Sequence, residues 1–277
     1  MKKLTKTLAE LKSAGRWDID FHSPAEGIQA FPRELWKRVD EVADVVKDKR
    51  DPTKKPDEVF QYIDISAVDV SVGVVVNPQE LEGVEAPSRA RKVVRAFDLI
   101  ISTCRPTRGA IAVVPVRLHN QVASTGFSIM RAHKNINPFY LHYALRLPST
   151  LEQFRKWSTG SSYPAILDSD VEKTVIPVPS QEMQDVIAAR VMTALRERAK
   201  IMEKSNEVWR ATLGEIADSL SIGGHVQSPH EELEEAVEEL EVLSLAEVQQ
   251  ILKSLPEIST DKNNHASEEP QESLELG

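Results

Sequence analysis

The sequence predicts an α+β protein, in which one mixed α/β domain is followed by a long coiled-coil helix and an acidic, partly disordered tail. Short runs of β-branched and apolar residues, broken by proline and glycine, recur through the first 180 residues and are typical of strands. Residues 181–220 contain no proline and a single glycine, which favours one continuous helix. Residues 229–277 hold 14 acidic residues against 2 lysines, a net charge of −12.

The bulk composition allows a packed core and does not exclude nucleic-acid binding. The formal net charge of the 277 residues is −9, and 41% of them are hydrophobic. Without the tail, the first 228 residues carry 32 basic and 29 acidic side chains, a net charge of +3. Charge asymmetry of this kind says more about partners than the total does.

The cysteine content and the hydropathy pattern predict the cellular compartment. The only cysteine, Cys104, rules out an internal disulfide and a cysteine-based metal site. No apolar run approaches the ~18 residues of a membrane span, and the N-terminal residues lack the apolar core of a secretory signal. We therefore expect a cytoplasmic protein without membrane contact.

The first part of the chain is predicted to fold as a helix followed by strands. Apolar residues recur at helical spacing behind Pro32, which predicts a helix over residues 32–46. Residues 60–76 read as two short strands. Strand character continues through residues 90–106 and 108–118.

Two helices are predicted after these strands. One begins at Asn137–Pro138, where an N-cap residue precedes a proline at the first helical position. The other begins at Ser149, which forms a capping box with Glu152. A further capping box, Ser244 with Glu247, predicts a short amphipathic helix in the tail.

The long helix is predicted to need a partner. It would measure about 60 Å at 1.5 Å per residue, which is too long for an ordinary core helix. Its apolar stripe would contact a partner helix, and seven residues represent it: Ile187, Val191, Leu195, Met202, Trp209, Leu213 and Ile216. The resulting domain boundaries are 1–179 for the mixed domain, 180–222 for the long helix and 223–277 for the tail with short amphipathic helices.

Four phrases in this order resemble the family of type I restriction–modification specificity subunits. They are RWDIDFHSP, ARKVVRAFDLIISTCRP, ASTGFSIMRAHKNINPFYLHYALRL and GSSYPAILDSDVEKTVIPVPSQEMQDVIAARV. The last has a glycine loop, a short turn, a β segment ending in Pro-x-Pro and then the start of a long helix. Full-length members usually carry two recognition domains and two spacer helices, whereas this chain has room for one of each.

The resemblance implies a non-catalytic half-subunit that reads DNA. Residues 1–179 would be the target-recognition domain, and residues 180–222 a spacer. The expected partners are double-stranded DNA, a DNA methyltransferase subunit, and a homodimer mate or second half-subunit along the long helix. A restriction subunit is a further candidate partner. No cofactor is expected on this chain, and S-adenosylmethionine would be bound by the partner methyltransferase.

Candidate DNA-binding residues are cations and hydroxyls near strand ends. A sequence reader needs cations for phosphates and hydrogen-bonding side chains for base edges. Each arginine, taken alone, could equally solvate a strand edge, and Tyr163 could be a packed loop anchor. The candidates are Arg89, Arg91, Lys92, Arg105, Arg108, Ser124, Thr125, Arg131, Lys134, Gly160, Ser161, Ser162 and Tyr163.

Other chemistry is weaker in the sequence. The Asn-Pro-Phe-Tyr stretch at 137–140 lacks the second proline of an adenine methyltransferase motif, and a helix cap explains it. Asp168, Asp170 and Glu172 could hold a metal or cap a short turn. Cys104 sits in an apolar run, which indicates a small core residue. Two alternatives stay open: an interaction protein built on the helix and tail, and a metal-dependent nuclease.

Overall fold

The computed structural model describes the chain except for residues 1–3, 24, 160–161, 220–242, 259 and 261–277. Two four-stranded sheets form its centre. One has the order β6-β3-β10-β7 and the other the antiparallel order β2-β11-β8-β9. The strands of the first are β3 Val59–Ile63, β6 Gln79–Glu82, β7 Ala90–Val94 and β10 Gln121–Ser124. Those of the second are β2 Ala43–Val45, β8 Leu99–Ser102, β9 Ile111–Val113 and β11 Phe127–Ala132.

Alternation along the strands of the second sheet separates two cores. Ile100 and Ile129 face the first sheet and share a cluster with Ile63 and Ala123. Leu99 and Ile101 face the other way, into a cluster with helix residues. Successive side chains of a strand point to opposite faces, so this sheet is covered on both sides and its strands are apolar throughout.

Helices cover the outer face of the second sheet. They are α3 Pro138–Leu145, α4 Pro148–Trp157, α5 Asp168–Glu172 and the start of α6 Gln181–Ser219. Tyr140 is 2% exposed and donates a hydrogen bond to the Pro177 carbonyl at 2.5 Å. Pro177 ends β12 Val175–Pro177, which pairs with β1 Trp36–Arg38. Two small strands, β4 Val68–Asp69 and β5 Val74–Val75, complete the domain.

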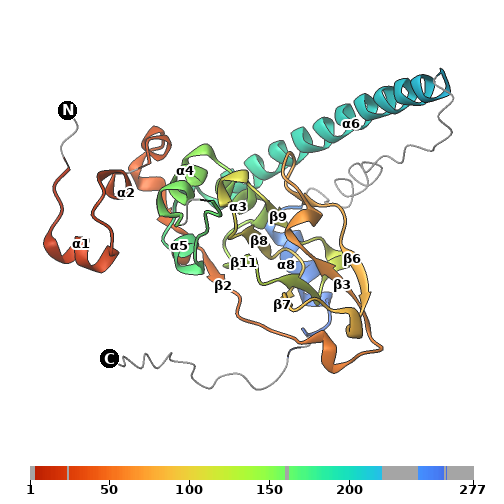
Figure 1. Cartoon of the computed structure of the whole chain (residues 1–277). Helices are drawn as coiled ribbons and strands as arrows, with labels where there is room; N and C mark the ends of the chain where they lie inside the picture. Colours follow the sequence, from red (N-terminus) through yellow and green to blue (C-terminus); the bar gives the residue numbers. More distant parts are fainter. Residues whose placement is uncertain (1–3, 24, 160–161, 220–242, 259, 261–277) are drawn as a thin grey trace, which may run out of the picture.

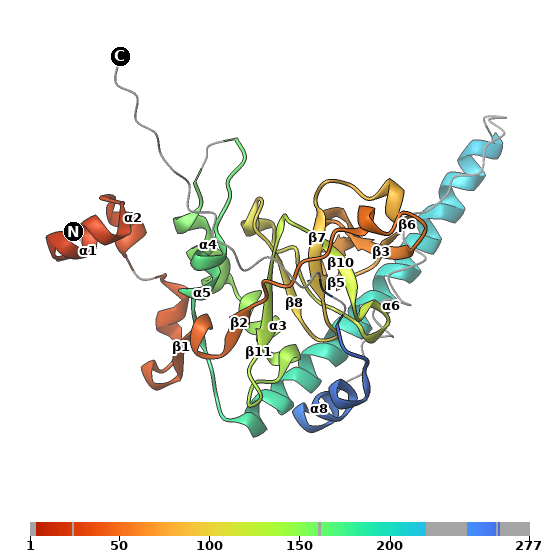
Figure 2. The same cartoon turned by 90° about the horizontal axis from the view of Figure 1, so that it is seen from below.

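The predicted long helix is confirmed, and it stands out from the domain as a rod (Figure 1). Its 39 residues correspond to about 58 Å. The two short N-terminal helices, α1 Leu8–Ala14 and α2 Ile19–His22, lie at the periphery beside α4 and α5 (Figure 2). Among the described residues, none of the helices combines the length and apolar character needed to cross a membrane.

The helix predicted over residues 32–46 is wrong. This segment forms two 3-10 turns and the strands β1 and β2. Val39 and Val42 are buried in one core cluster, and Val46 is buried in the other. Pairing of β1 and β2 with strands elsewhere in the fold stabilises this segment more than its helical spacing of apolar residues would.

The helix starts were predicted with mixed success. Asn137 caps α3 as predicted, because its Oδ1 accepts from the backbone N–H groups of Phe139 and Tyr140 at 2.9 and 3.3 Å. The Ser149–Glu152 box is wrong, since α4 begins one residue earlier at Pro148 and Ser149 is 3% exposed. A proline at the first helical position sets the start instead.

A C-terminal helix returns to the domain. The predicted box of Ser244 and Glu247 is confirmed at the start of α8 Leu245–Ser254. Leu245 and Val248 are 3% and 2% exposed, and α8 lies beside the start of α6 (Figure 2). This part of the tail therefore adds apolar side chains to the core of the domain.

His142 predicts a pH dependence of stability. It is 2% exposed on α3, and its Nε2 donates to the Ile111 carbonyl at 3.2 Å. Burial lowers the pKa of His142 from 6.5 to about 3. Between these values the unfolded chain binds the proton and the folded chain does not, so stability falls as the pH falls below 6.5.

From pH 7 to pH 5 this group should lower the free energy of unfolding by about 2 kcal/mol. Urea titrations of the parent and of His142→Gln at both pH values measure the difference. The variant should lose that part of the pH dependence. Equal pH dependence in the two proteins would contradict this prediction, because it would show that the pKa of His142 is the same in the folded and the unfolded chain.

Candidate nucleic-acid interface

Several sequence-predicted candidates meet at one end of the two sheets. The backbone N–H of Thr125, after β10, donates to the Arg89 carbonyl, before β7, at 2.9 Å. The N–H of Thr103, after β8, donates to the Gly126 carbonyl, also at 2.9 Å. The N–H of Arg105 donates to the Pro164 carbonyl at 2.7 Å. Four loops are thus joined side by side: those before β7, after β8, between β10 and β11, and between α4 and α5.

Six side chains of these loops form what we call the loop surface: Arg89, Arg105, Arg108, Thr125, Ser162 and Tyr163. Arg105 is half-buried, and the other five are exposed. Tyr163 is 77% exposed, and the guanidinium carbon of Arg105 lies 5.0 Å from the centre of its ring. A cation held over an aromatic ring is stabilised by the charge distribution of the ring. The loop surface therefore offers three cations, two hydroxyls and an aromatic ring on adjacent turns.

Backbone geometry fixes the direction of the Arg105 loop. Arg105 has φ 49° and ψ 52°, in the left-handed region, which a non-glycine residue enters only at a cost. Pro106 follows at the first position of a short 3-10 turn, and Gly109 closes the turn with φ 74°. Strained backbone of this kind is concentrated at functional sites.

Two candidates lie at the opposite end of the second sheet. Arg131 donates to both carboxylate oxygens of Asp98 at 2.8 Å, and Asp98 is 1% exposed. Burial raises the pKa of the Asp98 carboxyl, and the hydrogen bonds from Arg131 oppose that rise. Lys134 follows the far end of β11, where its carbonyl accepts from Gln249 of α8. Arg131 is therefore engaged within the domain, whereas the side chain of Lys134 is exposed. Neither residue belongs to the loop surface, and their DNA-binding role stays a prediction.

Three further candidates are engaged within the domain. Lys92 donates to the Phe127 carbonyl at 2.6 Å, and Arg91 donates to the Ala90 carbonyl at 2.8 Å. Ser124 is 0% exposed and its Oγ accepts from the N–H of Gly126. Side chains within a paired strand point to one face of the sheet or the other, whereas side chains in the loop after the strand can project into solvent. This explains why these three residues are engaged while those of the loop surface are accessible. Gly160 and Ser161 lie outside the described residues.

Sequence reasoning missed two exposed members of this region and misread a third. Thr107 and Thr159 are exposed beside the loop surface, and both are hydroxyl residues in loops already rich in candidates. Cys104, predicted as a core residue, is exposed. Its run of apolar neighbours ends with β8 at Ser102, so Cys104 belongs to the loop.

The acidic residues of α5 are engaged separately. Asp170 accepts from the backbone N–H of Leu167 at 2.8 Å and pairs with Lys173 at 2.6 Å. Asp168 lies 3.7 Å from the amine of Lys92. Within the described ranges, no cluster of three or more His, Cys, Asp or Glu side chains is placed to hold a metal ion. The turn-capping interpretation fits these contacts.

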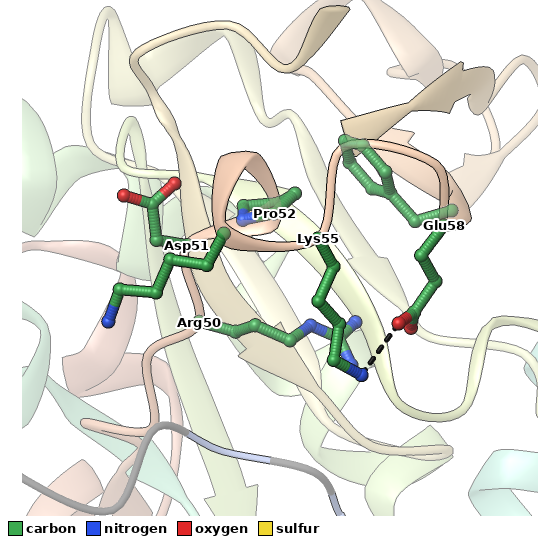
Figure 3. A pocket seen from close by; sticks show the side chains of 7 residues that line it. Arg50, Asp51, Pro52, Lys55 and Glu58 are labelled. Atoms are coloured by element: carbon green, nitrogen blue, oxygen red, sulfur yellow. Dashed lines mark ion pairs between the residues drawn. The ribbon is translucent and has the colours of Figure 1, made fainter. Parts of the chain in front are cut away.

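A separate pocket lies at the start of β10. It has a volume of about 270 Å³, and its lining is Arg50, Asp51, Pro52, Lys54, Lys55, Glu58 and Phe60 (Figure 3). Arg50 donates to the Asn120 carbonyl at 2.7 Å, and Lys55 pairs with Glu58 at 2.6 Å. Because the loop surface follows the end of the same strand, the pocket is not part of it.

Three of the seven residues of the predicted helix stripe pack against the chain's own domain. Ile187, Leu195 and Met202 lie against the core cluster that contains Leu99 and Tyr140. The sequence predicted a partner helix for these residues, and the structure places the domain of the same chain beside them. The outer part of α6 is different, because Ile201, Val208, Trp209 and Ile216 are 69%, 63%, 61% and 48% exposed. Val191 and Leu213 are half-buried.

Comparison with known proteins identifies the family. The family model of the type I restriction modification DNA specificity domain matches residues 34–208, more than half of the chain. The chain belongs to this specificity-domain family. The matched range contains the loop surface and the first 28 residues of α6, from Gln181 to Val208.

Relatives of this specificity domain are longer proteins. The chain is 28% identical over 163 residues to the type I restriction enzyme HindI specificity subunit of Haemophilus influenzae, covering 56% of this chain and 34% of the relative. It resembles the crystal structure of the HsdS subunit from Thermoanaerobacter tengcongensis with a TM-score of 0.53 and 37% identity, covering 70% of this chain and 51% of that one.

A second solved structure is described as the structural basis of complex assembly and conformational transition of the type I R-M system. The TM-score is 0.55 and the identity 36%, again over 70% of this chain and 51% of that one. The chain therefore spans about half the length of the solved relatives and about a third of the curated one.

The Asp98–Arg131 pair and the loop surface should respond differently to substitution. Arg131→Ala leaves a buried carboxylate unpaired, which should lower the free energy of unfolding by about 3 kcal/mol. Arg108→Ala removes an exposed side chain and should change it by less than about 0.5 kcal/mol. Urea denaturation measures both. Equal losses in the two variants would contradict the division between structural and surface arginines.

Proposed function

We propose that this chain is a DNA-specificity subunit that binds duplex DNA through the loop surface and directs a separate adenine methyltransferase to its target. That partner would flip the target base and use S-adenosylmethionine, and a restriction subunit would join the same complex. The observation that carries the proposal is the specificity-domain match over residues 34–208.

The chemistry of the loop surface supports this role. Arg89, Arg105 and Arg108 supply positive charge for phosphates and paired donors for guanine edges. Thr125 and Ser162 add short hydroxyls on neighbouring turns. Because these side chains come from four loops held by backbone hydrogen bonds, their relative positions are set before DNA arrives, which limits the ordering cost of binding.

The chain itself would not be a catalyst. Its acidic residues on α5 are engaged in turn capping and ion pairs, and the exposed groups of the loop surface bind rather than react. Purified alone, the chain should neither methylate nor cleave DNA. Combined with its cognate methyltransferase subunit, it should produce methylation at one defined sequence, detected by single-molecule sequencing. Methylation or metal-dependent cleavage by the chain alone would contradict the proposal.

Substitutions of loop-surface arginines should change the affinity for DNA and its dependence on salt. Arg105→Ala and Arg108→Ala should each weaken binding by about 1–3 kcal/mol where a base contact is lost, or reduce the salt slope by about 1 where a phosphate contact is lost. Fluorescence anisotropy with salt titration on a target duplex measures both quantities.

Arg117→Ala is the matched control, because Arg117 is an exposed arginine on the turn Val116–Leu118, at the other end of β10. This variant should keep the affinity and the salt slope of the parent. If the loop-surface variants behaved like Arg117→Ala, the loop surface would not be the DNA interface.

We also propose a homodimer through the outer part of α6. Apolar side chains project from α6 beyond the domain, and their exposure to water is unfavourable. Two-fold pairing of the helices would bury them. A second half-subunit or a methyltransferase helix is the alternative occupant. An antiparallel dimer would hold two recognition domains apart and read two inverted half-sites across a gap.

The structure refines the test of this dimer. Leu195 packs on the core, so a substitution there would damage the domain as well as the interface. Trp209→Glu with Ile216→Glu changes only exposed positions and should convert the dimer to a folded monomer. Light scattering with circular dichroism measures this. A parent that is already a well-folded monomer would contradict the homodimer.

A further inference from the structure

The three arginines of the loop surface differ in how firmly their side chains are held. The guanidinium carbon of Arg105 lies 5.0 Å from the centre of the Tyr163 ring, and Arg105 is half-buried. Arg89 and Arg108 are exposed, and within the described part of the chain their guanidinium groups form no hydrogen bond or ion pair. Arg105 therefore has the least side-chain freedom left to lose when a ligand binds.

Backbone hydrogen bonds hold both partners of the Arg105–Tyr163 contact. The N–H of Arg105 donates to the Pro164 carbonyl at 2.7 Å, and the Arg105 carbonyl accepts from a backbone N–H of the following turn at 3.0 Å. Thr159 and Ala165 exchange two backbone hydrogen bonds of 2.9 Å across the loop that carries Tyr163. The cation and the ring thus extend from two fixed stretches of backbone, so the fold itself brings them together.

The contact with the ring leaves the hydrogen-bond donors of Arg105 available. The face of an aromatic ring attracts a cation without taking up its N–H groups as a carboxylate would. Among the described residues, no side chain or carbonyl accepts from the Arg105 guanidinium. Arg131 is different, because its guanidinium donates to both oxygens of Asp98. Arg105 therefore combines a fixed position with unused donors.

Donors in a fixed position suit a base edge better than a phosphate. Guanine presents two acceptors, O6 and N7, side by side in the major groove, and an arginine can donate to both. Recognition of this kind needs donors held to within about 0.5 Å and 10–20°. A phosphate attracts a nearby cation without such precision, which the exposed Arg89 and Arg108 can supply.

We propose that Arg105 recognises one guanine of the target sequence and that Tyr163 is its positioning residue, while Arg89 and Arg108 contact phosphates. This inference rests on the proposed function, because it assigns tasks within the loop surface. It also names the class of target: a sequence with a G·C pair at one fixed position, recognised from the major groove. An adenine at that position would present its N6 amino group to the donors of Arg105 and would be rejected.

Replacement of a single DNA atom tests the guanine contact. The target is first determined by methylation with the cognate methyltransferase subunit. Each guanine of that target is then replaced in turn by 7-deazaguanine, which lacks the N7 acceptor, and fluorescence anisotropy measures the affinity of the full-length chain. One replacement should weaken binding by the parent by roughly 5-fold or more. The same replacement should leave the affinity of Arg105→Ala unchanged, because the contact is already lost.

Charge-conserving variants separate recognition of the base from attraction to phosphate. Arg105→Lys keeps the positive charge and loses the paired donors. Its preference for the target over a duplex with that G·C pair exchanged for A·T should fall by roughly 5- to 150-fold, with an unchanged salt slope. Arg108→Lys is the matched control, because it makes the same exchange at an exposed arginine on the turn after Arg105. It should keep both the preference and the slope of the parent.

Two substitutions of Tyr163 test the positioning role. Tyr163→Phe keeps the ring and removes the hydroxyl, so the preference for the target should remain. Tyr163→Leu removes the ring and should lower the preference at the same base pair as Arg105→Lys, with the preferences at other positions retained. Since Tyr163 is 77% exposed, neither change disturbs the core. A merely structural role would lower the affinity for all sequences alike.

Three results would overturn the assignment. One is a target without guanine. The second is a target in which no 7-deazaguanine replacement distinguishes the parent from Arg105→Ala. The third is a reduced salt slope for Arg105→Ala with unchanged base preference, which would place Arg105 on a phosphate. In each case Arg108→Ala would still weaken binding relative to Arg117→Ala if the loop surface is the interface, so failure of this inference is distinguishable from failure of the proposed function.

Discussion

A buried polar junction at the root of α6 determines how the parts of this protein are arranged. Asn137 is 0% exposed, and its side chain caps α3 while donating to Asp185 of α6 at 2.6 Å. Gln184 accepts from the Asn137 backbone N–H at 3.0 Å and donates to the Pro179 carbonyl at 3.0 Å. Asp185 also accepts from Leu245. Buried polar groups are costly unless every one finds a partner, so this network permits one orientation of α3, α6 and α8.

In that orientation the loop surface and the docking site of α8 lie at opposite ends of one domain. The loop surface lies after the ends of β8 and β10, and the junction lies beyond the opposite end of β11, where α8 docks. In Figure 2 the loop that follows α4 stands at the edge of the domain opposite to α8. The DNA contacts that we propose therefore do not overlap with the docking site of α8, and α8 does not cover the cations of the loop surface. The sheet between the two ends is buried on both faces, and a close-packed interior of this kind deforms little.

The sequence predicted the elements that local signals specify. The long helix lacks internal breakers, and the caps of α3 and α8 depend on side chains within three residues of the helix start. It failed where distant partners decide. Within residues 32–46, β1 forms because β12 pairs with it, and β2 forms because β11 pairs with it. No local pattern contains that information.

Site residues follow the same division. Arg108 and Tyr163 project from turns, so their exposure could be predicted from loop composition. Arg131 could not be separated from them, because its engagement depends on Asp98, 33 residues earlier in the sequence and 1% exposed in the fold. The stripe on α6 shows the same limit, because a helical period marks which side chains share a face and not which partner covers them.

The junction should hold α6 rigidly against the recognition domain. Spin labels at Thr107→Cys, beside the loop surface, and at Glu215→Cys, on the outer part of α6, report the distance between these parts by double electron–electron resonance in the Cys104→Ser background. Labelled chains are diluted with unlabelled protein, so that distances within one copy dominate. The account predicts one narrow distance distribution for the parent and a broad one for Asn137→Ala. A broad distribution in the parent, or an equally narrow one in the variant, would contradict it.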